Sequence, residues 1–132
     1  EKYRNLEIKK LRSFGVSVNL VSESKIKELN KKYRGKNKPT DVLSFPIEKS
    51  LEIRNSKLEI EKDIGDIFLY LSIAKKEAKR ENVSIERKLA QLTVHGFLHL
   101  MGYDHERSKR EAEKMLSLEG RILSKLGLLS KK

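Results

Sequence analysis

The spacing of apolar and polar residues changes between the helical and the extended period along the first half of the chain. Residues 1–14 carry a rough helical stripe of apolar side chains between lysines and arginines, which predicts a basic amphipathic helix. Residues 16–21 follow with the two-residue alternation of a strand, and Ser22 then stands where a serine caps the start of a helix. A lysine-rich break leads to a second strand over 42–47, and the charged residues 48–63 are expected to form a loop.

The second half of the chain is mostly helical. A third strand is expected over 64–70, and a helix over about 72–81 follows it. After Ser84 comes an apolar helix that should be buried on most sides, and a last helix is expected over about 108–126. A few strands joined by helices and followed by helices only predict one α+β or α/β domain over residues 1–132, with a small sheet on a helical layer.

The histidines are concentrated in the apolar helix and directly after it. His95, His99 and His105 are the only three in the chain. A four-residue step turns a helix by roughly 400°, so His95 and His99 project from one face about a turn apart. His105 lies about 80–120° around the helix from them, so the chain must turn before it can join them. Gly102 is expected to supply that turn, and the spacing predicts a zinc site with three nitrogen ligands.

The spacing of these histidines coincides with the zinc motif of the metzincin proteases, but Gly96 stands where those enzymes have a catalytic glutamate. A glycine inside a helix indicates close approach of packed chain or of substrate. Three protein ligands leave a fourth position for water, whose pKa zinc lowers toward about 7, so the expected chemistry is hydrolysis. Asp104 could orient a ring N–H, become a fourth ligand or accept a proton, and the spacing does not choose between these roles.

Charge and composition limit the kinds of partner that the protein is expected to bind. The net charge of +11 and the isoelectric point of about 9.8 indicate a polyanion, although a solvated lysine-rich surface is the alternative. The basic excess is greatest within residues 1–38. Cysteine is absent, which excludes disulfides and thiolate ligands and favours a reducing cytosol. No apolar run approaches a membrane span, so no membrane partner is expected.

A second dense segment, residues 30–46, places cations at a turn between helix and strand. Arg34 could grip a phosphate with two parallel hydrogen bonds, with the nearby lysines adding attraction that ignores base sequence. The alternative for Arg34 is stabilisation of the helix end, and the alternative for Asp41 is a turn or cap residue. Lys38 is the next candidate for contact with phosphate.

Together these segments resemble the YbeY family of bacterial rRNA maturation factors. The resemblance rests on H-G-x-L-H-L-x-G-Y-D-H at 95–105, N-x-x-Y-R at 30–34, K-P-T-D-V-L-S-F-P at 38–46 and G-D-I at 65–67. It implies an α+β fold with a small mixed sheet, several helices and a central helix that carries the metal site. It also implies a zinc-dependent endoribonuclease that prefers single strands and acts in small-subunit rRNA 3′-end maturation and ribosome quality control.

The resemblance assigns residues as well. One zinc ion per chain would be held by His95, His99 and His105, and the functional arginine of the family corresponds to Arg34. Two other readings are a metzincin-like zinc peptidase and a non-catalytic rRNA-binding assembly factor with a structural zinc. The expected partners are single-stranded RNA, small-subunit rRNA and ribosome-assembly proteins, in the cytoplasm. The candidate catalytic residues are Arg34, His95, His99, Asp104 and His105, and the candidate substrate-binding residues are Arg34, Lys38, Thr40, Asp41 and Ser44.

Overall fold

The computed structural model describes residues 15–54 and 63–127, and within them the chain forms three strands and five helices. The helix expected over residues 1–14 lies outside the described residues. The strands are β1 (Gly15–Leu20), β2 (Val42–Pro46) and β3 (Asp63–Leu69), and the helices are α2 (Glu23–Arg34), α3 (Ile47–Arg54), α4 (Leu71–Glu81), α5 (Ile85–Leu100) and α6 (Lys109–Lys125).

The sheet has β3 at its centre, with β1 parallel to it on one side and β2 antiparallel on the other. This mixed sheet with its helices confirms the α+β class. From Ile64 to Leu69 every residue of β3 is buried, as expected for a strand that is covered on both faces. Pro46 is the last residue of an edge strand, where its missing N–H leaves no ladder bond unmade.

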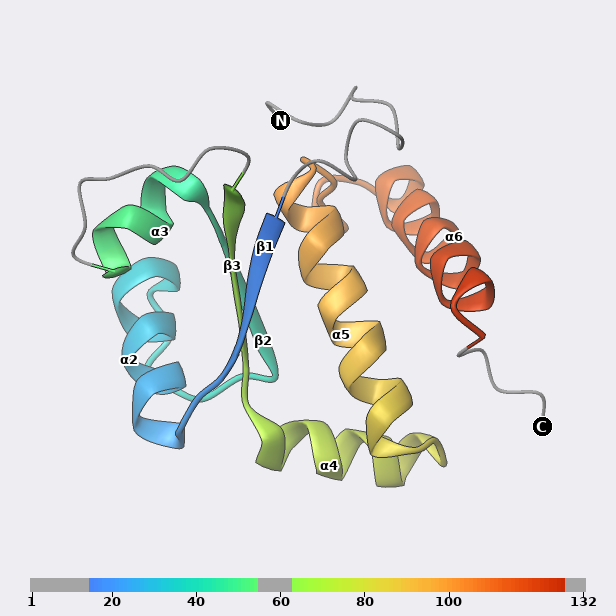
Figure 1. Ribbon diagram of the computed structural model, residues 1–132, viewed down its shortest axis with the longest axis horizontal. Coiled ribbons are helices and arrows are strands. Elements are labelled where there is room, and N and C mark those ends of the chain that lie inside the picture. The colour runs from blue at the N-terminus through green and yellow to red at the C-terminus, as the bar shows by residue number, and fades with distance from the viewer. Residues whose placement is uncertain (1–14, 55–62, 128–132) are drawn as a thin grey trace.

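Helices α2 and α3 lie on one side of the sheet, and α5 lies on the other (Figure 1). On the α2 side, Ile26 and Leu29 pack against Leu43 and Phe45 of β2 and Phe68 of β3. This helix has no second apolar face, so its exposed side is lined by lysines. The cationic turn of residues 35–39 follows this helix and leads into the start of β2.

Helix α5 is central because it contacts the sheet, α4 and α6. Gly96 faces Ile67 of β3, and a Cβ added there would lie 3.2–3.3 Å from three Ile67 side-chain atoms. The close approach expected at Gly96 is therefore packed chain. On its other side α5 packs Val94 and Leu98 against Met115 and Leu123 of α6, which lies outermost in Figure 1.

A serine caps the start of three helices. The sequence predicts the first two of these starts, at Ser22 and Ser84, and the third, at Ser108, agrees with the start expected at about 108. Ser22, Ser84 and Ser108 each accept a hydrogen bond from the backbone N–H three residues ahead. The apolar spacing of the last helix predicts Met115, Leu118 and Ile122 on its core face, and the structure of α6 differs from this in part. Met115 is buried, Leu118 and Ile122 are half-buried, and the other buried residues are Glu119 and Leu123.

The loop expected over residues 48–63 is wrong for its first part, because α3 runs from Ile47 to Arg54. The second strand also ends one residue earlier than expected, with Ile47 already in the helix. Buried Ile47 and Ser50 lie three residues apart on the face toward the sheet, and the Ser50 hydroxyl donates to the Phe45 carbonyl at 2.9 Å. The many charged residues of this segment lie on an eight-residue helix too short for a clear period. No helix of the described residues is long and apolar enough to cross a membrane.

Candidate metal centre

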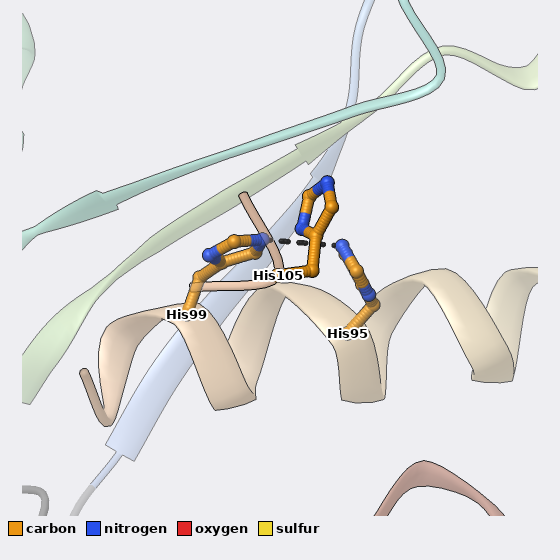
Figure 2. A group of neighbouring side chains, drawn as sticks. All are labelled: His95, His99 and His105. Carbon is orange, nitrogen blue, oxygen red and sulfur yellow. Dashed lines mark hydrogen bonds between the residues drawn. The ribbon is translucent and has the colours of Figure 1, made fainter. Parts of the chain in front are cut away.

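The three histidines meet at the end of α5. His95 and His99 project from the same side of the helix, and His105 folds back from the following turn (Figure 2). Their ring centroids are 4.7–5.3 Å apart, and one nitrogen from each ring can be chosen so that all three lie within 4.8 Å of one another. Three imidazoles at this separation suit a single divalent transition metal such as zinc. The group expected from the spacing is thus brought together in the fold.

The turn that returns His105 is specified by Gly102. Its φ of 97° lies in the region that favours glycine. The Gly102 N–H donates to the His99 carbonyl at 2.9 Å and the Tyr103 N–H to the Leu98 carbonyl at 3.1 Å, the paired bonds of a Schellman helix end. The predicted role of Gly102 is confirmed.

The electrostatics of the cluster favour neutral imidazole at His99. Burial lowers the pKa of His99, and the neighbouring His95 and His105 rings lower it further when they carry charge. The Asp104 carboxylate and a hydrogen bond with the Tyr103 backbone act in the opposite direction without reversing the shift. A ring that resists protonation keeps a lone pair for a metal.

A cleft of about 840 Å³ runs past the histidines. Its lining includes the three histidines and, from the first half of the chain, the end of α2 with the turn after it. Every candidate substrate-binding residue lines this cleft: Arg34, Lys38, Thr40, Asp41 and Ser44. Lys36, Pro46 and Lys88 line it as well. The fold therefore joins the two dense sequence segments into one surface.

Arg34, the last residue of α2, is exposed in this cleft. One of its guanidinium nitrogens donates to the Ser44 carbonyl at 3.0 Å, and the guanidinium carbon lies 5.0 Å from the centroid of the Phe45 ring. These contacts direct the side chain along β2. A hollow of about 350 Å³ beside the cleft is lined by Arg34, His99 and Asp104 among others, so the guanidinium and the metal centre share a border.

Asn30 stabilises the turn after α2 through two hydrogen bonds. The buried Asn30 side chain donates to the Lys38 carbonyl at 2.8 Å, and the Asn30 backbone carbonyl accepts the Lys36 N–H at 3.2 Å. Asn30 is therefore a structural member of the N-x-x-Y-R motif. Tyr33 is another, because its hydroxyl donates to Glu52 at 2.8 Å and its ring meets Phe45 edge-on.

Asp41 lines the cleft and interacts with its neighbours through both its backbone carbonyl and its carboxyl group. The Asp41 carbonyl accepts the Tyr70 N–H at 3.0 Å. Burial raises the pKa of Glu77, and the facing Asp41 carboxyl raises it further, whereas Lys88 acts to lower it. Lys88 is nearly buried and lies 3.4 Å from Glu77 and 3.0 Å from Glu81. These groups fix the wall where α4 and α5 meet.

Asp104 takes a position beside the histidines and also shapes their turn. Its Oδ1 accepts the Glu106 N–H at 2.9 Å, and its carbonyl accepts the Arg107 N–H at 3.1 Å. These bonds hold the segment that carries His105. Among the described residues, the set of side chains close enough to share a metal ion contains the three histidines and does not include Asp104.

Sequence reasoning missed Glu119. It is 6% exposed on α6, and its Oε2 lies 2.5 Å from Nδ1 of His95. Gln91, one turn before His95, donates to the other carboxylate oxygen at 3.2 Å. The spacing of Met115, Glu119 and Leu123 by four is visible in the sequence, but only the fold shows that these three residues form the buried stripe of α6. A carboxylate on such a stripe needs a polar partner inside the protein.

The fold and the site define a small α+β protein with a cationic cleft and, in it, three histidines that could hold a metal ion. A family model described as "Endoribonuclease YbeY" matches residues 2–127. The chain belongs to this family, as the sequence resemblance indicated.

Similar proteins agree with this assignment. The chain is 41% identical over 111 residues to "Endoribonuclease YbeY" of Persephonella marina, covering 84% of this chain and 69% of that protein. It is 39% identical over 127 residues to the protein of the same name from Lactobacillus helveticus, covering 92% and 72%. A solution structure of TM1509 from Thermotoga maritima matches with a TM-score of 0.53 and 36% identity, covering 89% of this chain and 75% of that one.

Proposed function

We propose that the protein is a zinc-dependent endoribonuclease that prefers single-stranded RNA and acts in small-subunit rRNA 3′-end maturation and ribosome quality control. The observation that carries the proposal is the meeting of three imidazoles and the Arg34, Lys36 and Lys38 cations in one cleft. The named endoribonucleases among the chain's relatives support the same activity. The family relationship supports ribosome-assembly proteins as partners. Together with the lack of cysteine, it also supports a cytoplasmic location.

In this proposal His95, His99 and His105 hold one zinc ion. Bound there, zinc would supply Lewis acidity and acidify a water molecule for hydrolysis at neutral pH. The chain's own residues position the RNA. Arg34 contacts the scissile phosphate through its planar donors, and Lys36 and Lys38 attract the flanking phosphates.

The remaining polar residues of the cleft would position the ribose and bases. Thr40, Asp41 and Ser44 offer hydroxyl and carboxylate groups around the start of β2, in the same cleft as the histidines. A ribose 2′-hydroxyl can both donate and accept, which suits such a mixed surface. Asp104 is the candidate for proton transfer, because its carboxylate borders the hollow shared by His99 and Arg34.

The peptidase alternative is disfavoured by the packing at Gly96. A metzincin needs a glutamate at this position, but a side chain there would start 3.2 Å from Ile67 of the central strand. The scaffold alternative, with a purely structural zinc, is disfavoured by exposure. A structural site is closed by four protein ligands, whereas His105 is 44% exposed at the cleft.

The test combines metal analysis with cleavage of a single-stranded RNA. We expect the native chain to bind one equivalent of zinc, to cleave, and to lose cleavage when a chelator removes the metal. The His99→Ala variant should bind zinc weakly and not cleave, while Lys114→Ala, an exposed change on α6 outside the cleft, should behave like the native chain. Zinc should also raise the melting temperature of the native chain, because a ligand of the folded state stabilises it. Cleavage that survives complete metal removal would contradict the proposal.

A further inference from the structure

Glu119 is a buried carboxylate on α6 that faces a metal-centre histidine on α5. Only 7% of its side chain is exposed, and both of its oxygens have partners within the protein. Oε1 accepts from the Gln91 amide at 3.2 Å, and Oε2 lies 2.5 Å from His95 Nδ1. Burying a carboxylate is costly without such partners, so its place opposite His95 requires a specific interaction.

The contact determines which nitrogen of His95 faces the cluster. A neutral imidazole carries one proton, and an ionised carboxylate can only accept, so the bond to Glu119 keeps that proton on Nδ1. The lone pair is then on Nε2. This atom lies 3.1 Å from Nε2 of His99, at the centre of the group in Figure 2.

Gln91 orients the carboxylate in turn. Gln91 and His95 are four residues apart on α5 and face α6 together. By occupying Oε1, the amide of Gln91 leaves Oε2 directed at the imidazole. Met115 and Leu123, one turn away on either side of Glu119, pack against α5 and fix the distance between the helices.

We propose that Glu119 is the positioning residue of the metal centre: it sets the tautomer and the ring orientation of His95 so that Nε2 is the ligand atom, and Gln91 holds it in place. The inference rests on the proposed function in that it takes the three histidines to bind zinc. Carboxylates that hold ligand histidines in this way commonly contribute 10–100-fold to metal affinity.

The experiment compares two substitutions at Glu119 that differ in one property. Glu119→Met keeps the length of the side chain but leaves the His95 N–H without an acceptor. Glu119→Gln keeps an acceptor oxygen, and the Gln91 amide can turn to match it. We expect zinc affinity, measured by competition with a chromophoric chelator, to fall about 10–100-fold in Glu119→Met and to stay within a few-fold of native in Glu119→Gln.

A matched control separates positioning from packing. Leu123→Ala, one turn further along the same buried stripe, removes packing between α5 and α6 without touching His95. It should lower the melting temperature and leave the zinc affinity of the folded protein unchanged. An equal loss of affinity in Leu123→Ala and Glu119→Met would show that Glu119 acts through packing alone, which would overturn the proposal.

A second readout needs no metal. Nitrogen NMR of the imidazole rings in the metal-free native chain, at a pH where they are neutral, should show the His95 proton on Nδ1 in both the native chain and Glu119→Gln. In Glu119→Met the other tautomer should become populated. A native His95 with its proton on Nε2 would overturn the proposal even if Glu119→Met failed to fold. Failure of the native chain to bind zinc would instead contradict the proposed function and leave the tautomer result to decide the role of Glu119.

Discussion

At the scale of single residues, Arg34 lies between the cationic turn and the three histidines. Its contacts with the Ser44 carbonyl and the Phe45 ring direct the guanidinium along β2. It borders both the cleft and the hollow that contains His99 and Asp104. These contacts hold the guanidinium at the cleft, where the proposed phosphate contact would be made.

The first prediction concerns Arg34→Ala. If Arg34 contacts the scissile phosphate, it stabilises charge that develops in the transition state, and its loss should slow single-turnover RNA cleavage by about 10²–10³-fold. Zinc content should stay native, and the melting temperature should fall only slightly, because this exposed side chain loses its bond to the Ser44 carbonyl and its contact with Phe45. Arg34→Lys should recover only part of the rate, because lysine keeps the charge and loses the planar pair of donors.

Arg121→Ala serves as the control, since Arg121 is exposed on α6 and lies outside the cleft lining. It should cleave at the native rate. Full cleavage by Arg34→Ala together with a lower melting temperature would assign Arg34 to the helix end, and Lys38 would then be the next candidate for the phosphate contact.

At the scale of elements, α3 shows what the sequence could not reveal. Its eight residues present two buried side chains, too few for a period to be recognised. What holds the helix is remote in sequence. Arg54 at its end bonds Asp63 at 3.0 Å and Asp66 at 2.5 Å, both on β3, and Ser17 of β1 also donates to Asp66. No local sequence pattern predicts these hydrogen bonds between α3 and the sheet.

The second prediction concerns these hydrogen bonds. Removing one partner of a charged, mostly buried hydrogen-bonded pair should cost about 1.5–3 kcal/mol, so Arg54→Met should lower the free energy of unfolding in urea by that amount at neutral pH. Burial acts to raise the pKa of Asp66, but hydrogen bonds from Arg54 and Ser17 outweigh it, and the pKa lies below its ordinary value.

The sign of the pH dependence follows from that shift. A lowered pKa in the folded state means that the stabilisation is complete above the unfolded pKa of about 3.9 and is lost as the pH falls through the folded value. The native chain and Arg54→Met should therefore converge in stability in acid. Lys49→Met, an exposed neighbour on α3, should cost less than about 1 kcal/mol at any pH. A difference between the native chain and Arg54→Met that did not change with pH would exclude ionised Asp66 as its cause.

At the scale of the whole molecule, local information predicted local features. The histidine cluster, the turn at Gly102 and, apart from α3, the order of strands and helices after residue 15 all depend on spacing within short segments, and these predictions are confirmed. Glu119 was missed because its role exists only once α6 packs on α5. Gly96 was predicted in part: a glycine inside a helix indicated that something approaches closely, and only the fold identified Ile67 as the neighbour.

The charge of the molecule gives the last prediction. Lys36 and Lys38 line the cleft, and Lys31 and Lys32 line a second hollow on the outer side of α2, next to the same turn. Phosphate contacts release counterions, so the logarithm of RNA affinity should fall with the logarithm of salt concentration at a slope of about −0.7 per contact for single strands. Changing these four lysines to glutamine should flatten the slope by up to about 3, as measured by fluorescence anisotropy over a salt series.

Charge alone must be separated from position, and α4 and α6 offer matched lysines. Lys75, Lys79, Lys114 and Lys125 are exposed and line neither hollow. Changing them to glutamine removes the same net charge, so it should weaken long-range attraction slightly and leave most of the slope. Equal flattening by both sets would mean that RNA responds to the net charge of +11 and not to a track through the cleft. A selective effect of the first set would place the RNA backbone along the end of α2, beside the histidines.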